Sequence, residues 1–409
     1  MLKQVLKGMV IGGAALAMVG TANAATIDVN LYGASAQYKF WTAAAGNFLV
    51  SQGCTDVKNA AQSGALDSRD SGWTQGTCGS DTVNIRYTTN ASYDGIRAVM
   101  ADPAYDPDGC GPANRLQPSA ATFAAHPASG TVTAHSCQDV HIGASDVAAT
   151  TFNQESHGQL LGHLGGGYFD SVVKFPNDLG DPEAAGYQVD RPIVVPFGFF
   201  GHPGIPVDNV SRLMVTSIYN GQVSNWDQFG FASLPMVVCL RHAGSGTAAT
   251  LDAAVMRGDF PLAINEIPST DPLVGLGLAP TIWFNKGSSD EMRCVSGNAG
   301  AIGYADVDKC PDTGGTGKCA VKRLDWMGID TSATGAYTVA DAIRNGLYDF
   351  WSAQWLYSNE AGATDTWIDA LVTFSSVGAN IPSGKALYWA AQDDMNWEKA
   401  TDFSYPKKK

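Results

Sequence analysis

The sequence feature that most constrains the fold is a repeated order of strand, small polar cluster and helix. The segments 27–31, 82–87, 139–142 and 234–240 are typical of strands, and each ends in a cluster rich in Gly, Ala, Ser, Thr or Asp. Because the carboxyl ends of neighbouring parallel strands meet at one edge of a sheet, we expect these clusters to face a common cleft. The pattern predicts an α/β fold whose ligand lies beyond the strand ends.

The most informative cluster is Arg241–Thr247, with the sequence RHAGSGT. It follows an expected strand and precedes a good helix-forming segment, 248–256. Such a turn presents backbone N–H groups, the hydroxyls of Ser245 and Thr247 and the positive end of a helix dipole to one point. Arg241 is placed to grip an oxyanion with two parallel hydrogen bonds. The stretch therefore predicts an anion-binding loop.

The N-terminus predicts export from the cytoplasm. Lys3 and Lys7 precede an apolar segment, 9–19, and Ala22-Asn23-Ala24 is a small-residue cleavage site. This order is typical of a secretory signal peptide, here 1–24, and it is too short for a membrane anchor. The first cysteine is Cys54, so no lipid-bearing cysteine follows the expected cut. We expect the mature protein to be free in a periplasm or outside the cell.

The eight cysteines fit an oxidising compartment, and their even number permits complete pairing. The sequence does not determine the connectivity. Nearness along the chain favours Cys54–Cys78, Cys110–Cys137, Cys239–Cys294 and Cys310–Cys319. No C-x-x-C occurs, which disfavours zinc-ribbon and thioredoxin-like interpretations.

Composition excludes several classes of partner. The formal net charge of −14 makes the chain a poor binder of nucleic acid or of an anionic membrane. It also repels an anionic ligand overall, so an anion site must work through local geometry. A mature length of about 385 residues favours two domains over one core.

The remaining segments are interpreted more coarsely. Helical periodicity is expected at 38–50, 92–100, 210–219 and, as a long amphipathic helix, 338–357. Apolar strands at 192–200 and 299–304 are expected to cross between two domains. The segments 51–81 and 101–136 are interpreted as loop-like insertions, 158–190 as a further insertion and 257–281 as a loop.

Five motifs, in this order, resemble those of the periplasmic phosphate-binding proteins that feed ABC transporters, members of the type II periplasmic binding protein family. They are Gly33-Ala34-Ser35-Ala36-Gln37, Gly143-Ala144-Ser145-Asp146, the segment 218–227 (IYNGQVSNWD), Arg241-x-x-Gly244-Ser245-Gly246-Thr247 and Gly300-Ala301-Ile302-Gly303-Tyr304. The resemblance covers roughly 27–305, apart from the insertions.

The resemblance implies two α/β lobes that are joined by two crossover hinge strands and close on phosphate in the cleft between them. We place lobe 1 at 25–195 together with 304–409, and lobe 2 at 196–303. It further implies a monomer without catalysis, metal or cofactor that delivers inorganic phosphate to a permease in the inner membrane.

The resemblance also implies roles for individual residues. Asp146 would accept the proton of phosphate, Arg241 would be the charged clamp, Ser245, Gly246 and Thr247 the anion loop, and Ser92 the serine at a helix start. In the first loop either Ser35 or Gln37 falls at the ligand position, with the backbone N–H of Ala36 or Gln37 serving in either case. Some members carry an acid where Ala243 stands, so the orientation of Arg241 is left to other groups.

The residues themselves explain why phosphate is the expected anion. Phosphate near neutral pH still carries a proton, which the carboxylate of Asp146 can accept, whereas sulfate would oppose a bare oxygen to that carboxylate. A mispaired buried group costs about 1–3 kcal/mol, and more when it is charged. Arsenate carries the same proton and is not excluded.

Two other interpretations remain open. The cysteine-rich and aromatic insertions are compatible with a secreted or surface-displayed phosphate-binding or adhesion protein of the same fold without a transport role. A phosphatase-like hydrolase would use the same cleft, but the chain lacks a Gly-x-Ser-x-Gly motif, and its histidines lack the spacing of a helical metal site.

Overall fold

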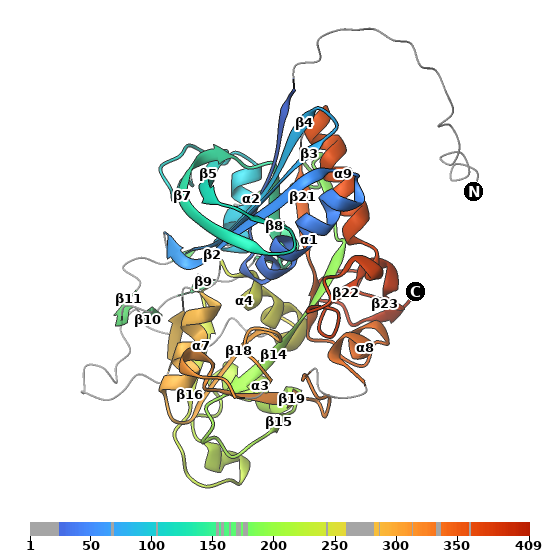
Figure 1. The fold of residues 1–409 in the computed structure, drawn as a ribbon. Coiled ribbons are helices and arrows are strands. Elements are labelled where there is room, and N and C mark those ends of the chain that lie inside the picture. The colour runs from blue at the N-terminus through green and yellow to red at the C-terminus, as the bar shows by residue number, and fades with distance from the viewer. Residues whose placement is uncertain are drawn as a thin grey trace.

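The computed structural model consists of two large sheets with helices packed around them (Figure 1). This mixed arrangement confirms the α/β fold expected from the strand and helix pattern. The structure describes residues 24–409 except 67–68, 104, 153–154, 157–158, 163–164, 169–172, 175–178, 243, 259–281, 286, 313, 333–336 and 360. None of the helices described in these ranges is long and apolar enough to cross a membrane.

The first sheet has the strand order β13-β21-β8-β1-β4-β3-β2-β7-β5, with β6 paired to β2. Its strands are β1 (Thr26–Gly33), β2 (Thr55–Leu66), β3 (Arg69–Cys78), β4 (Asp81–Thr89), β5 (Asn114–Thr122), β6 (Ala124–Ala125), β7 (Ser129–Asp139), β8 (Ile142–Ser145), β13 (Gln188–Asp190) and β21 (Trp355–Ser358). At its centre β1 runs parallel to both β4 and β8. The carboxyl ends of these three strands therefore lie together, as the repeated clusters predicted.

The interpretation of 51–81 and 101–136 as loop-like is wrong for most of both segments. β2 and β3 form an antiparallel hairpin, and β5 pairs antiparallel with β7. These strands bury polar side chains in hydrogen-bonded pairs, such as Thr74 Oγ1 to Asn59 Oδ1 at 3.0 Å and Thr88 Oγ1 to Gln117 Oε1 at 2.8 Å. Because the inward residues are polar, the apolar alternation that identifies a strand is missing.

The second sheet has the order β11-β10-β17-β16-β18-β14-β19-β15, with β20 and β22 also paired to β14. Its strands are β10 (Gln159–Gly162), β11 (Gly165–Tyr168), β14 (Ile193–Gly201), β15 (Asn209–Val210), β16 (Val237–Arg241), β17 (Ile282–Asn285), β18 (Ala301–Asp306), β19 (Lys322–Trp326), β20 (Trp351–Ala353) and β22 (Ala390–Ala391). Two small pairs complete the strands: β9 (Glu155–Ser156) with β12 (Val173–Lys174), and β23 (Trp397–Glu398) with β24 (Lys407–Lys408).

The chain passes between the sheets at two adjacent places. It leaves the first sheet between β13 and β14, and it returns between β20, which pairs with β14, and β21, which pairs with β8. Gln354, the residue between β20 and β21, donates its N–H to Ile193 O at 2.8 Å. The apolar strand expected to cross back, 299–304, corresponds to β18, which lies in the second sheet between β16 and β14.

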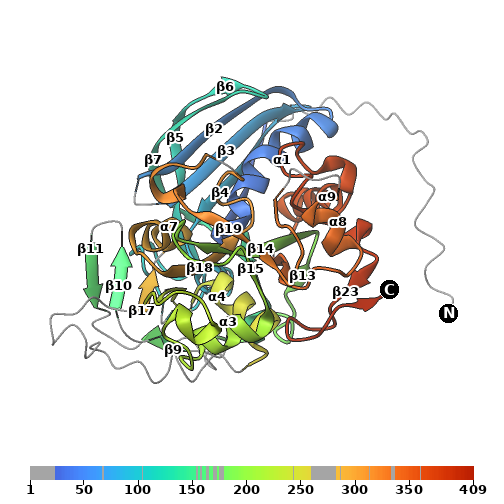
Figure 2. The same cartoon turned by 90° about the horizontal axis from the view of Figure 1, so that it is seen from below.

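The helices are α1 (Tyr38–Ser51), α2 (Ser92–Val99), α3 (Arg212–Tyr219), α4 (Gly246–Leu251), α7 (Ser288–Gly297), α8 (Val339–Arg344) and α9 (Ala363–Ser375), and a π-helical turn, η4 (Asp252–Met256), continues α4. The helices predicted at 38–50, 92–100 and 210–219 are confirmed. α1 and α9 lie side by side on the first sheet, where the ring centroids of Phe48 and Trp367 are 5.8 Å apart (Figure 2).

The long helix predicted at 338–357 is wrong beyond its first turns. α8 ends at Arg344, and Gly346 follows with a φ of 71°, a left-handed conformation that favours glycine and ends a helix. The apolar residues after it belong to β20 and β21, which are almost entirely buried, so their spacing imitates a helical face. Leu347, on the apolar face of the predicted helix, is 60 % exposed.

The four predicted disulfides are confirmed. Cys54–Cys78, Cys110–Cys137, Cys239–Cys294 and Cys310–Cys319 are all bonded, with sequence separations of 24, 27, 55 and 9. The first bridge joins Cys54, directly before β2, to the end of β3, and the third joins β16 to α7. Each bridge therefore connects elements of one sheet and its helices.

Candidate functional site

The first part of the site forms where α2 begins and β8 ends. Ser92 is the first residue of α2, and Asp146 directly follows β8. Because β1 lies between β4 and β8 in parallel, the segments that follow these strands converge. The backbone N–H of Asp146 donates to Ser92 Oγ at 3.2 Å, and both side chains are buried, each with 1 % of its surface exposed.

The second part of the site comes from the other sheet. Arg241 is the last residue of β16, and a short turn leads to Gly246 at the start of α4. The N–H of Tyr93 in α2 donates to Gly244 O at 3.3 Å, so this turn lies against the N-terminus of α2. Elements of both sheets thus meet at the predicted anion loop.

Gly246 makes the closest approach between the two parts. A Cβ atom at this position would lie 2.2 Å from Ser92 Oγ and 2.7 Å from Asp146 Oδ2. Side-chain atoms do not come this close to a neighbouring Cβ, so this position requires glycine. Three of the predicted site residues are therefore brought into direct contact.

We expect the substitution Gly246→Ala to weaken anion binding roughly 10- to 100-fold, because an inserted methyl in a packed contact costs about 1–3 kcal/mol. Isothermal calorimetry with phosphate measures the change. Gly384→Ala is the matched control, since a Cβ at Gly384 meets nothing within 4 Å. Equal affinities for the two variants would contradict the close approach at Gly246.

Asp146 has the electrostatics of a proton-sharing carboxyl. Burial and the charge of Asp306 raise its pKa, Arg241 and the hydrogen bond from Ser92 oppose the rise, and the resulting pKa is about 7. Its Oδ1 atom is buried and accepts no hydrogen bond from any residue that the structure describes. The carboxyl therefore presents an acceptor in a dry cleft at a pKa close to neutrality.

Arg241 and the anion loop are equally buried. Arg241, Ser245 and Thr247 each expose 2 % of their surface. The backbone N–H of Arg241 donates to the hydroxyl of Tyr304 at 3.1 Å, which fixes the end of β16 against β18. Ala243 stands where some of the proteins that the motifs resemble carry an acid, and it lies outside the described residues.

The first loop contributes in a different way from the other segments. Ser35, Ala36 and Gln37 form a single 3₁₀ turn between β1 and α1. The amide of Gln37 donates to Ser145 O at 3.0 Å and accepts from Trp41 Nε1 at 2.8 Å, so this side chain holds the end of β8. Ser35 is half-buried and Ala36 is buried, and the choice between Ser35 and Gln37 as the ligand residue stays a prediction.

A comparison with known families finds a match for the part of the chain that contains Arg241. Residues 181–376 match the model described as the PBP superfamily domain. These residues are therefore similar to that domain. The matched range contains the anion loop and α7, whereas Ser92 and Asp146 precede it.

Solved structures with similar coordinates include three phosphate receptors or related proteins. A protein from Clostridium perfringens, assigned as a phosphate ABC transporter substrate-binding protein and holding phosphate, is 15 % identical, with 88 % of this chain and 98 % of that chain covered and a TM-score of 0.49. A DING protein is 14 % identical, with coverages of 92 % and 96 % and a TM-score of 0.49. An ABC-type phosphate transport receptor from Vibrio cholerae is 14 % identical, with coverages of 84 % and 93 % and a TM-score of 0.42.

The matched range, 181–376, also holds two acids that the sequence interpretation missed. Asp306 ends β18 and raises the pKa of Asp146, while Glu291, in the first turn of α7, is fully buried. Burial raises the pKa of Glu291 to about 8, and the charge of Arg241 opposes that rise. The predicted bridge Cys239–Cys294 could have indicated that Glu291 lies near the site, because it joins α7 to the strand that carries Arg241.

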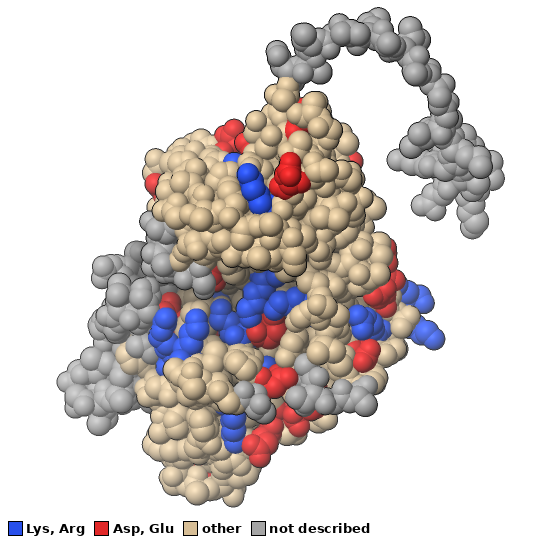
Figure 3. Space-filling view, in the orientation of Figure 1, with Lys and Arg blue, Asp and Glu red and all other residues tan. Residues whose placement is uncertain are grey.

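The surface between the two halves of the molecule is basic. Figure 3 shows Lys and Arg side chains gathered in a band where the upper half meets the lower, in a chain whose net charge is −14. One contact across this boundary is made by Lys39 of α1, whose Nζ lies 3.6 Å from a carboxylate oxygen of Asp308 after β18. Asp308 also pairs with Lys385. The positive band gives an anion a favourable approach despite the negative total charge.

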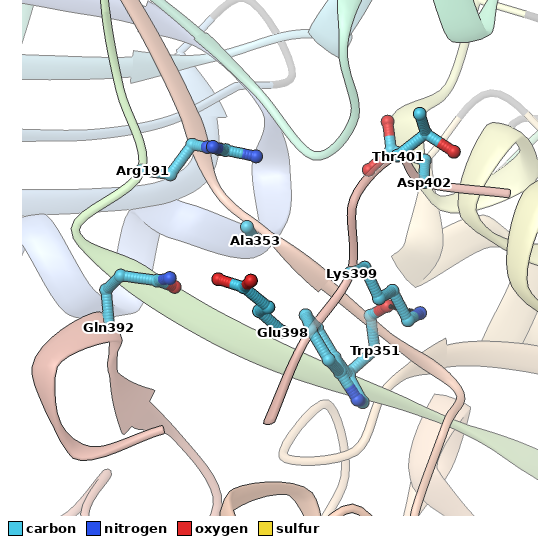
Figure 4. A pocket seen from close by; sticks show the side chains of 8 residues that line it. All are labelled: Arg191, Trp351, Ala353, Gln392, Glu398, Lys399, Thr401 and Asp402. Atoms are coloured by element: carbon cyan, nitrogen blue, oxygen red, sulfur yellow. Dashed lines mark hydrogen bonds between the residues drawn. The ribbon is translucent and has the colours of Figure 1, made fainter. Parts of the chain in front are cut away.

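A separate small cavity of about 30 Å³ lies where β20 meets the C-terminal segment (Figure 4). Its Lys399 donates to Asp349 O at 2.9 Å and Trp351 O at 2.6 Å, and burial lowers the pKa of Lys399 to about 7. Asp402 accepts from Ala148 N at 2.7 Å. The space suits about one water molecule. Because Lys399 and Asp402 already bind protein atoms, we interpret these groups as structural contacts between β20 and the C-terminal segment.

Proposed function

We propose that this chain binds inorganic phosphate between its two halves and delivers it to an ABC transporter permease. The observation that carries the proposal is the buried carboxyl of Asp146, with a hydrogen-bond acceptor open, beside Ser92 and the glycine of the anion loop. Arg241, Ser245 and Thr247 would supply charge and donors, as the motif resemblance implies. The proposed role is binding without catalysis.

The pKa of Asp146 favours a protonated anion as the ligand. Because the pKa of Asp146 is about 7, the shared proton can come from either partner. Phosphate monoanion with ionised Asp146 and phosphate dianion with protonated Asp146 give the same complex. Sulfate brings no proton and is accepted only when Asp146 is protonated. A site built around a ligand O–H can reject an analogue that lacks it by roughly 10⁴-fold.

The cellular setting is proposed on the sequence features. We propose cleavage after Ala24, a periplasmic location without a lipid anchor and a monomeric receptor. The division into lobes at 195–196 and 303–304 also stays a prediction. The placement of β14, β16 and β18 in one sheet supports a second lobe that contains the anion loop.

Calorimetry on the mature protein with phosphate, sulfate and arsenate tests the function. We expect phosphate and arsenate to bind at micromolar concentration or tighter, and sulfate to bind at least a thousandfold more weakly, or roughly 4 kcal/mol less favourably. Phosphate at 100 times its Kd should add about 2.7 kcal/mol to the free energy of unfolding. Absence of thermal protection by millimolar phosphate would contradict the proposal.

A further inference from the structure

The disulfide Cys239–Cys294 fixes how α7 lies against β16. Side chains on a strand share a face at every second residue, so Arg241 projects to the same side of β16 as Cys239. Side chains on a helix share a face at every third or fourth residue, so Glu291 faces the same way as Cys294. Both cysteines are fully buried. The bridge therefore directs Glu291 and Arg241 toward the same space.

The direction of α7 brings these two side chains to the same level. β16 is parallel to both β17 and β18, and α7 connects β17 to β18. α7 must then run against the strands, with its first turn at their carboxyl ends. Arg241 is the last residue of β16 and pairs with Asn285, three residues before α7 begins. Glu291, in that first turn, lies at the level of Arg241 and the anion loop.

The hydrogen bonds around Glu291 hold its carboxylate in place. Its Oε1 accepts the backbone N–H of Tyr304 at 2.9 Å, and the hydroxyl of Tyr304 accepts the backbone N–H of Arg241 at 3.1 Å. A Cβ at Gly303 would lie 3.3 Å from the same Oε1, so the glycine leaves room for the carboxylate. Oε2 is buried and accepts no hydrogen bond within the part of the chain that the structure describes.

We infer that Glu291 is the internal counter-ion of Arg241 and competes with the bound anion for it. The inference rests on the proposed function, because it deepens the role of the same site. When Glu291 is ionised, its charge offsets part of the cost of burying the guanidinium of Arg241. When an anion binds, two like charges share one guanidinium in a dry cleft and repel each other. Glu291 thereby positions Arg241 and limits the affinity of the site.

The substitution Glu291→Gln tests this role, because glutamine keeps the size of the side chain and an acceptor for the N–H of Tyr304. At pH 9, where Glu291 is ionised, we expect the phosphate Kd of the variant to be roughly tenfold lower than that of the wild type. A residue that merely supports the fold would lower stability and weaken binding together. Unchanged or weaker phosphate binding in Glu291→Gln would overturn the inference.

Asp290→Asn is the matched control on the same helix. Asp290 pairs with Arg293 at 2.6 Å, so removing its charge should leave the phosphate Kd unchanged. An equal tightening in Asp290→Asn would show a general effect of net charge and would also overturn the inference.

A pH series adds a measurement that would not change with pH if Glu291 had only a structural role. The charged and titratable groups that interact with Glu291 are Arg241, Tyr219, Tyr304, Asp306 and Lys309. Because Glu291 is ionised only toward alkaline pH, the ratio of the wild-type Kd to the Glu291→Gln Kd should rise between pH 6 and pH 9. Phosphate and Asp146 titrate in both proteins and cancel in that ratio. A ratio that does not change with pH would count against the counter-ion.

A double-mutant cycle separates this inference from the proposed function. The stabilities of wild type, Glu291→Gln, Arg241→Met and the double variant are measured by chemical unfolding without ligand. A favourable coupling supports the pair even if the wild-type protein fails to bind phosphate, which would contradict the proposed function alone. Additive effects would overturn the pairing even if phosphate binds tightly.

Discussion

Replacing Asp146 by asparagine is expected to abolish the discrimination between phosphate and sulfate. Asparagine has the shape of aspartate but presents N–H donors to the ligand in place of a carboxyl that shares a proton. Phosphate should lose one charge-assisted hydrogen bond, worth about 1.5–3 kcal/mol, and bind roughly 10- to 100-fold more weakly. Sulfate should bind more tightly than to the wild type, because its bare oxygen would now meet a donor. Calorimetry with both anions at pH 8, where Asp146 is mainly ionised, measures the change.

The control for this experiment is a partly buried carboxyl outside the cleft. The pKa of Asp190, in β13, is also raised by burial, and its side chain accepts from Gln188 at 2.9 Å. We expect Asp190→Asn to leave both affinities unchanged. If Asp146→Asn still rejected sulfate as strongly as the wild type does, the selectivity would have to reside elsewhere in the cleft.

Replacing Arg115 by methionine should cause the largest loss of stability that we predict. Arg115 lies in β5, and its Nε donates to Asp94 Oδ1 in α2 at 2.8 Å, with both side chains fully buried. Its other nitrogens bind backbone carbonyls, including Pro112 O at 3.1 Å and Tyr105 O at 3.2 Å. Removing one partner of a buried ion pair strands the other and costs about 3–5 kcal/mol. Urea unfolding measures the loss.

A partly exposed ion pair provides the comparison for Arg115. Arg344 and Asp341 are 3.3 Å apart on the surface of α8, and such pairs contribute about 0–1 kcal/mol. A loss for Arg115→Met as small as that for Arg344→Met would mean that β5 and its neighbours are peripheral. The expected larger loss would show that this part of the chain supports α2, whose first residue is Ser92.

The parts of the fold that the sequence predicted well are those in which apolar periodicity and polar strand ends coincide. β1, β4 and β16 and the helices that follow them have this character, and so the loop at Arg241–Thr247 was recognisable. The strand predicted at 139–142 shares only Ile142 with β8, although Asp146 does follow that strand as expected. The antiparallel strands between α1 and β8 were not, because they bury hydrogen-bonded polar residues such as Asn59 and Gln117.

The other errors have equally local causes. At 338–357 the spacing of apolar residues suits a helix, but Gly346 ends α8, and Trp351 and Leu356 are buried in two successive strands. Glu291 was missed because no motif marks it. Its position near Arg241 follows from the way the Cys239–Cys294 bridge packs α7 against β16. That packing can be inferred only once the bounds of both elements are known.

The order of the disulfides has a consequence for how the chain matures. The bridges join the first cysteine to the second, the third to the fourth, the fifth to the sixth and the seventh to the eighth. Eight cysteines allow about 105 different sets of four bridges. An oxidant that couples thiols in the order in which they emerge from a translocation pore would produce the native set directly. Such a chain needs a donor of oxidising equivalents but little help from an isomerase that reshuffles wrong pairs.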